Sequence, residues 1–187
     1  MKQASNQIPN FPLLINECIN NNRSSQYELY NYFSGKMYYV CLRYAIHTDD
    51  AQDILQDGFV KLFKNLEKFR HEGSFEGWVR RIFVNTAIEH LRKKVDITSI
   101  NEKHEEQIEF KEVTGLNKLQ AKDIHDLIAT LSPGYKTVFN LYEIEGYSHR
   151  EVSEILGISE GTSKSQLARA KGILKKELIK LYPDLEH

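Results

Sequence analysis

The segment 148–176 most narrowly limits the possible folds of this chain, because two short helical patterns meet there at a glycine. Ser148 and Glu151 form an S-x-x-E capping box, which satisfies the free amides at the start of a helix. Gly157 supplies the left-handed residue that ends this helix, and Ser159 is the natural N-cap of the next one. The spacing predicts a helix-turn-helix, whose second helix is the one that enters a DNA groove.

The second helix of this motif has two unlike sides. The inward side is formed by Ser163, Leu167, Ala170, Leu174 and Leu178, which recur at helical spacing. The opposite side is polar and cationic, and we expect it to face the edges and phosphates of duplex DNA through Thr162, Lys164, Ser165, Gln166, Ala168 and Arg169. Between residues 160 and 180 six basic residues stand against two acids, which favours this interpretation over two solvated helices with a charged face.

Composition predicts an all-α, globular protein. The chain has 187 residues, 41% of them hydrophobic, with four prolines, ten glycines and no strand-like alternation of any length. No apolar run approaches the roughly 18 residues of a membrane span and the amino terminus lacks a signal pattern, so we expect a cytoplasmic protein with no membrane insertion. Cys18 and Cys41 lack metal-ligand spacing, and we expect buried thiols, no metal and no cofactor.

The charges are sorted along the chain although the formal net charge is only −1. Residues 48–60 carry four acids and no base, residues 61–94 carry nine bases and four acids, and residues 95–126 carry eight acids and four bases. Alternating acidic and basic blocks indicate different surfaces with different partners.

An acidic helix is predicted over residues 49–69. Its buried side is expected to consist of Leu55, Phe59, Leu62, Phe63 and Leu66. Asp50, Asp53 and Asp57 are expected to project from the other side, with Ile54 beside them and Gln56 nearer the edge. This row is either a solvated acidic face or a docking surface for a basic protein helix. Paired catalytic acids are a further alternative, but no His, Ser or metal-ligand cluster accompanies them.

A basic helix is predicted over residues 75–94, after a turn at residues 70–74 in which Ser74 is the cap. Trp78 belongs to its inward stripe, and beside that stripe Arg81, Asn85, Ile88 and Arg92 form another. Arginines, an asparagine and nearby aromatic rings are the ingredients for holding single-stranded nucleic acid. Taken alone, Trp78 is better explained as a core residue.

The periodicity divides the chain into five parts. We expect an N-terminal extension with a short helix (1–23), a first helical module (24–94), a flexible acidic linker (95–120), a second helical module (121–184) and a purification-tag remnant (185–187).

The motif-bearing segments together resemble a known family, the small extracytoplasmic-function (ECF) sigma factors of bacterial RNA polymerase. DDAQDILQDGFVKLF is similar to the family's regions 2.1 to 2.2, and GSFEGWVRRIFVNTAIEHLRKK to regions 2.3 to 2.4. The stretch from LSPGYK to LKKEL, residues 131–178, is similar to region 4. The resemblance implies a region 2 helical bundle and a region 4 helix-turn-helix, with all three segments in the family's order around an acidic linker.

The resemblance also implies a role for each surface. The residues implied to bind the coiled coil of the polymerase's largest subunit are Asp50, Asp53, Ile54, Gln56, Asp57 and Phe59. The residues implied to capture and melt the minus-ten strand are Phe69, Ser74, Phe75, Trp78, Arg81, Asn85 and Arg92. Among them, Asn85 corresponds to the position that lines the pocket for a flipped base. Recognition of the minus-thirty-five duplex is implied for the six outer residues of the second helix of the helix-turn-helix. The usual sequence of that helix in the family is GTVKSRLHRAR, and this chain differs from it at Ser163, Gln166, Ala168 and Lys171. Because side chains on this helix select the bases, these differences put the preferred bases in doubt.

The function implied by the resemblance is that of a sigma factor, which binds core polymerase at the coiled coil and the flap, reads duplex promoter DNA and captures single-stranded promoter DNA. An anti-sigma factor is a further expected partner, and no chemistry is expected of this chain. Two alternatives remain from the residues alone. One is a dimeric helix-turn-helix repressor that binds a palindrome without polymerase. The other is a metal-dependent enzyme acting on nucleic acid through the acids of residues 49–57.

Overall fold

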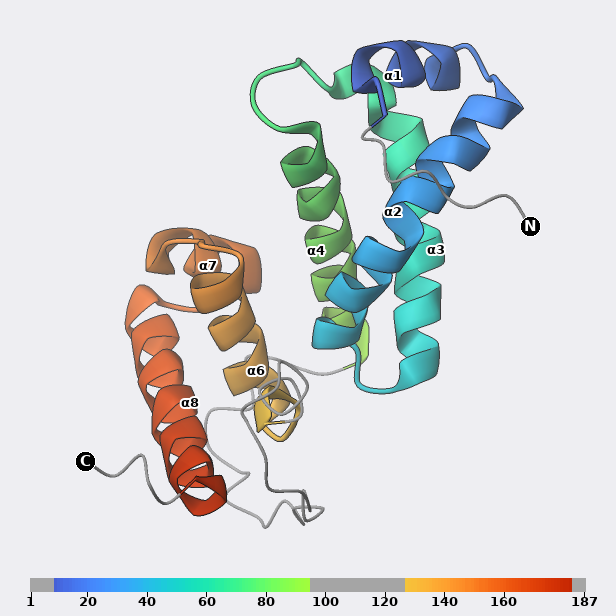
Figure 1. The fold of residues 1–187 in the computed structure, drawn as a ribbon. Coiled ribbons are helices and arrows are strands. Elements are labelled where there is room, and N and C mark those ends of the chain that lie inside the picture. Colours follow the sequence, from blue (N-terminus) through green and yellow to red (C-terminus); the bar gives the residue numbers. More distant parts are fainter. Residues whose placement is uncertain (1–8, 95–126, 183–187) are drawn as a thin grey trace. The chain divides into compact units, whose positions relative to one another are not determined.

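The computed structural model describes residues 9–94 and 127–182 (Figure 1). The chain divides into two compact units between His90 and Leu91. Every regular element in the described ranges is a helix, which confirms the all-α prediction. The expected linker and the three terminal residues lie outside these ranges.

The described part of the first unit contains four α-helices and one short 3-10 turn, and the last four residues of α4 lie beyond its boundary. The elements are α1 (Phe11–Ile19), α2 (Arg23–Tyr44), α3 (Thr48–Asn65), η1 (Leu66–Lys68) and α4 (Phe75–Lys94). Its core is apolar and fully enclosed, since the following residues are 0% exposed: Leu29, Phe33, Leu62, Val79 and Phe83. Burial of large side chains from α2, α3 and α4 in one core stabilises the three helices together.

One glycine sets how closely α3 approaches α4. Gly58 lies in the middle of α3, and a Cβ built on it would overlap the ring of Phe83 on α4. Because a side chain larger than hydrogen does not fit there, Gly58 is required by the packing of these two helices.

The face that α3 buries differs from the predicted one. Asp50, Ala51, Ile54, Phe59 and Leu62 are buried, whereas Leu55 and Phe63 are only half-buried. The backbone N–H of His47 donates to Asp50 Oδ2 at 3.3 Å, so this carboxylate is used at the start of the helix. The buried arc is turned towards Ile54 because α3 packs against α2 on one side and against Phe83 of α4 on the other.

The second unit contains the helix-turn-helix. Its elements are α6 (Pro133–Phe139), the π-helix η3 (Asn140–Ile144), α7 (His149–Leu156) and α8 (Glu160–Leu181), preceded by helical residues 127–129. Val138, Leu141, Val152 and Leu156 form its core with Leu167 and Ala170 of α8.

The predicted capping of the helix-turn-helix is confirmed. The backbone N–H of Ser148 donates to Glu151 Oε2 at 2.8 Å, and the N–H of Glu151 donates to Ser148 Oγ at 3.3 Å. Gly157 ends α7 with a φ of +69°, in the left-handed region that glycine adopts without strain. The Oγ of Ser159 accepts from the N–H of Thr162 at 2.9 Å and begins α8.

Candidate nucleic-acid and protein interfaces

The first turns of α8 present a short polar surface to solvent. Lys164, Ser165, Ala168 and Arg169 are exposed, as expected for residues that face a DNA groove. Thr162 is half-buried, and its hydroxyl lies 2.9 Å from Ser159 Oγ, so it also belongs to the cap. Five of the six predicted residues therefore reach solvent at least in part.

The sixth residue, Gln166, lies on the inner side of α8. Its exposed fraction is only 1%, and it shares the buried side of the helix with Ser163, Leu167 and Ala170. The prediction that it faces outward is wrong, because α8 packs against both α6 and α7 and so buries a wider arc than the apolar residues mark. A side chain in this position contributes to the interior and does not reach a base edge.

A histidine that sequence reasoning missed connects the two helices of the motif. His149 Nδ1 lies 2.9 Å from Ser163 Oγ of α8, and the His149 ring stacks on Tyr142 with centroids 4.2 Å apart. Ser163 is 0% exposed, so the contact fixes α7 against α8 from within. The signal in the sequence was Ser163 at an inward position of the helix, because a buried hydroxyl needs a hydrogen-bond partner such as His149.

On α4 the structure brings the predicted single-strand residues to one side. Arg81, Asn85 and Arg92 are exposed and recur at spacings of four and seven, while Trp78 is half-buried next to them. They offer two guanidinium groups, an amide and part of an indole ring along about four helical turns. Phosphates, base edges and base faces are the groups that such side chains bind.

The loop before α4 is exposed, and aromatic contacts hold it at both ends. Phe69 precedes it and Phe75 follows it, and their ring centroids lie 5.0 Å apart. Phe69 also contacts Trp78 at 5.3 Å. Both phenylalanines are largely buried, with exposed fractions of 9% and 5%. They are therefore the base of the loop and do not offer free ring faces to a nucleotide.

Inside this loop two residues have a positive φ. Gly73 has a φ of +90°, and His71 has a φ of +58°, which is uncommon for a residue with a side chain. The His71 ring contacts Phe69, with centroids 4.8 Å apart. Ser74 then begins α4, since its Oγ accepts from the N–H of Gly77 at 3.4 Å. Sequence reasoning had not singled out His71.

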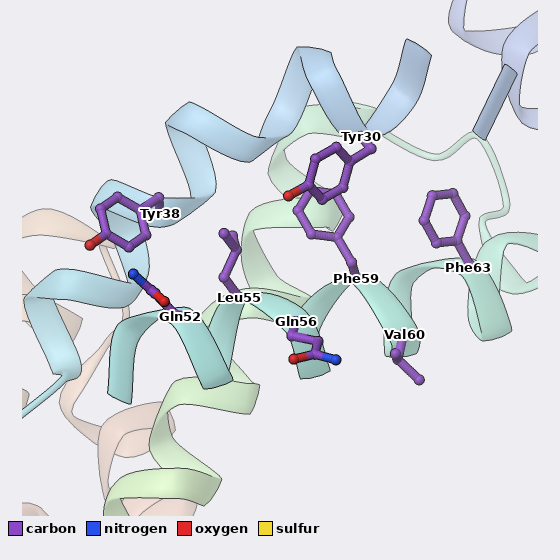
Figure 2. Close-up of a pocket in the computed structure, with 8 residues that line it drawn as sticks. All are labelled: Tyr30, Tyr38, Gln52, Leu55, Gln56, Phe59, Val60 and Phe63. Carbon is purple, nitrogen blue, oxygen red and sulfur yellow. The ribbon is translucent and has the colours of Figure 1, made fainter. Parts of the chain in front are cut away.

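An open groove of about 610 Å³ lies between α2 and α3 (Figure 2). The residues that line it are Tyr30, Tyr38, Gln52, Leu55, Gln56, Phe59, Val60 and Phe63. Figure 2 shows the Tyr30 ring over Phe59, and their centroids are 4.6 Å apart. Val60 is 45% exposed and adds an accessible aliphatic side chain to the groove. An apolar groove with amides at its edge suits the apolar face of a partner helix.

The candidate docking residues of α3 separate into exposed and buried groups. Asp53, Gln56 and Asp57 are exposed, and Asp57 Oδ2 lies 2.7 Å from His90 Nε2 of α4. Ile54 and Asp50 are 1% and 8% exposed, so the prediction that both project from the outer face is wrong. Phe59 is 5% exposed and forms part of the floor of the groove.

Both cysteines are buried and held in the thiol form. Burial raises the pKa of Cys18 to about 11 and that of Cys41 to about 12. In residues 9–94 and 127–182 no three His, Cys, Asp or Glu side chains come together as a metal ion would require. No helix within these same ranges combines the length and the apolar character needed to cross a bilayer.

A helix-turn-helix in one unit, and a basic helix that follows a loop flanked by aromatic residues in the other, are the architecture of an all-helical DNA-binding protein. Comparison with protein families gives a narrower assignment. Residues 29–96 match the model of sigma-70 region 2, and residues 121–174 match that of sigma-70 region 4.

Individual relatives agree with the family models. The RNA polymerase sigma factor SigV of Bacillus subtilis is 31% identical over 143 residues, which cover 76% of this chain and 84% of SigV. The ECF RNA polymerase sigma-E factor of Haemophilus influenzae is 27% identical over 158 residues, covering 78% of this chain and 83% of the relative. The sigma factor RpoE of Bartonella quintana, solved in complex with the anti-sigma factor NepR, has the same fold with a TM-score of 0.51 and 20% identity over 83% of this chain and 96% of that chain. This chain belongs to the ECF sigma factors of RNA polymerase.

Proposed function

We propose that this sigma factor performs its three tasks through three separate surfaces formed by α3 with α2, by α4 with its loop, and by α8. The observation that carries the proposal is the exposed row of Arg81, Asn85 and Arg92 beside Trp78 on α4. A protein that binds only duplex DNA through a helix-turn-helix does not need such a row. This argues against a free-standing repressor.

Docking on core polymerase is assigned to the groove between α2 and α3 and to its acidic margin. The groove offers the exposed side chains of Tyr30 and Val60 to an apolar helix face, Phe59 lies in its floor, and Gln56 lies at its edge. Asp53 and Asp57 are exposed on the same helix and suit basic residues of that partner. The coiled coil of the polymerase's largest subunit has the required helical form. Ile54 and Asp50 support this surface from inside.

Strand capture is assigned to Ser74, Trp78, Arg81, Asn85 and Arg92. Arginines neutralise the phosphates of the unpaired strand, and stacking on an aromatic ring stabilises each bound base by about 1–3 kcal/mol. Taking a base out of the stack costs a few kcal/mol, so contacts made only by the extruded base favour the open state. Phe69 and Phe75 act indirectly, by holding the loop.

Reading of the minus-thirty-five duplex is assigned to Thr162, Lys164, Ser165, Ala168 and Arg169. Arg169 is suited to a guanine edge or to a phosphate, and the methyl group of Ala168 to the methyl group of thymine. With Gln166 in the interior, base selection rests on fewer side chains than the sequence predicts.

The two family matches, residues 29–96 and 121–174, support the following division of the chain. Residues 24–94 are the module for docking and opening, 121–184 the module for upstream recognition, and 95–120 the linker between them, with 1–23 as an N-terminal extension. The chain is a transcription initiation factor that acts by binding and carries out no reaction of its own. It acts in the cytoplasm, where polymerase and DNA are found. We include the polymerase flap and an anti-sigma factor among its partners, the latter because RpoE of Bartonella quintana was solved with one.

The experiment is to separate polymerase binding from promoter opening by substitution. Asp53→Arg should weaken core binding at least tenfold by placing a cation against the basic partner helix. Asn85→Ala and Trp78→Ala should retain core binding and reduce opening, measured by permanganate reactivity of unpaired thymines. Asp49→Arg, also exposed on α3, is the matched charge control. Full core binding by Asp53→Arg would contradict the docking assignment.

A further inference from the structure

The N-terminal helix α1 contacts the aromatic cluster at the base of the loop that precedes α4, residues 70–74. Phe11, the first residue of α1, lies with its ring centroid 5.1 Å from Phe75, 5.4 Å from Tyr32 and 5.9 Å from Phe33. Phe33 is 0% exposed and belongs to the core of the first unit. Phe11 therefore joins the core to the residue that begins α4.

These contacts continue from Phe75 to the loop and to the single-strand surface. The Phe75 ring lies 5.0 Å from Phe69, at the other end of the loop, and 5.9 Å from Trp78. Phe69 in turn contacts His71 within the loop. A shift of the Phe75 ring would therefore move both ends of the loop and the indole that faces the strand.

The rest of α1 fixes the place of Phe11. Leu14, Ile15 and Cys18 are buried against the unit, and Ser25 Oγ donates to Glu17 Oε2 at 2.5 Å. The Asn10 side chain accepts from the N–H of Leu13 at 3.4 Å and begins the helix. The helix is thus anchored along its length, and its first residue supports the start of α4.

A second set of contacts holds the start of α4 from α2, and it includes Tyr32, whose ring also contacts Phe11. Tyr32 Oη donates to Glu76 Oε1 at 2.8 Å, and Lys36 Nζ lies 2.9 Å from the same oxygen. The Lys36 and Glu76 side chains are exposed, so solvent weakens their ion pair, whereas Phe11 is half-buried and its ring contacts are apolar. The support from α1 therefore does not depend on an exposed ion pair.

We propose that Phe11 is a positioning residue for strand capture, which supports Phe75 so that the loop of residues 70–74 and Trp78 are already arranged when the unpaired strand arrives. The inference rests on the proposed role of α4 in capturing that strand. An exposed loop with two left-handed residues has few contacts of its own to keep it in one conformation. Loss of the support would require the loop to be ordered at the moment of binding, which lowers affinity for the strand.

The test measures strand affinity and core affinity separately, in holoenzyme assembled from the full chain and bacterial core polymerase. The probe is a fluorescent single strand selected from a random-sequence pool by holoenzyme that contains the unsubstituted chain. Phe11→Ala should weaken binding of this strand about tenfold while core affinity stays within about twofold. Phe11→Tyr retains the ring and should bind the strand as the unsubstituted chain does.

Leu14→Ala distinguishes positioning from general destabilisation. Leu14 is buried in the same helix at 5% exposure but is not part of the ring cluster, so its loss should lower the melting temperature and leave strand affinity unchanged. Strand affinities that fall in both alanine variants in proportion to their melting temperatures would overturn the inference, as would an unchanged affinity in Phe11→Ala. If Asn85→Ala and Trp78→Ala also bind the strand normally, the proposed role of α4 is itself overturned, and the inference with it.

Discussion

Single side chains of this protein can have opposite roles although they are neighbours in sequence. Gln166 and Arg169 are three residues apart on α8, yet one is 1% exposed and the other is exposed. Both are polar groups that could pair with a purine edge. Only Arg169, which reaches solvent, can pair with a base, whereas Gln166 contributes to the stability of the interior.

Alanine substitution should separate these two roles. Gln166→Ala should destabilise the protein by about 1–3 kcal/mol, because it removes a buried polar side chain from a packed interior. Arg169→Ala should leave the melting temperature unchanged and weaken binding to duplex promoter DNA by about 1–3 kcal/mol. Thermal unfolding and duplex-binding assays on both variants measure the two effects, and a large loss of stability in Arg169→Ala would contradict the assignment.

The buried thiols give a pH-dependent prediction at the same scale. Because burial raises the pKa of Cys41 from 9.0 to about 12, the reactive thiolate is scarcely populated in the folded protein at pH 8. A disulfide reagent should modify Cys41 slowly in buffer and rapidly in urea. The raised pKa also means that stability is retained below pH 9 and lost as the pH rises towards 12, since the unfolded chain ionises first. Fast modification of the folded protein would show that Cys41 is accessible.

Whole helices depend on the fit of their neighbours as well as on their own sequences. α3 contains Gly58, which is unfavourable in a helix, and the reason is the ring of Phe83 on α4. α2 also contains a glycine, Gly35, around which a Cβ would find open space. The same residue type is thus required in one helix and dispensable in the other.

Replacing each glycine by alanine should give opposite results. Gly58→Ala should lower the free energy of unfolding by about 1–3 kcal/mol, because the added methyl group forces α3 and α4 apart. Gly35→Ala should raise it by about 0.5–1 kcal/mol, because alanine loses less backbone entropy in a helix. Urea unfolding of the two variants provides the measurement, and equal effects would mean that α3 and α4 are not in close contact at Gly58.

The described residues form two hydrophobic cores, one in each unit. A core that holds one set of helices melts as one cooperative element, so calorimetry should resolve separate transitions for the two units. Gly58→Ala should shift only the transition of the first unit. Val138→Ala, at a position 0% exposed in the second unit, should shift only the other. A single transition that moves as one in both variants would show that the units unfold together.

Local sequence determined where the helix-turn-helix begins and turns. Ser148, Glu151, Gly157 and Ser159 have the caps and the left-handed turn that their order predicts. Capping depends on atoms within three or four residues of one another, so it can be predicted from the sequence alone. The row of Arg81, Asn85 and Arg92 was likewise predictable, because helical periodicity places such residues on one side.

Only the tertiary structure decided which sides of the helices are enclosed. Ile54 and Gln166 were expected outside and lie inside, because α2 packs on α3, and α6 and α7 pack on α8, and these helices widen the buried arc. The contact between Phe11 and Phe75 joins residues more than sixty positions apart, and no local pattern encodes it. Sequence periodicity gives the direction of each side chain around its helix axis, whereas burial depends on which other helices pack there.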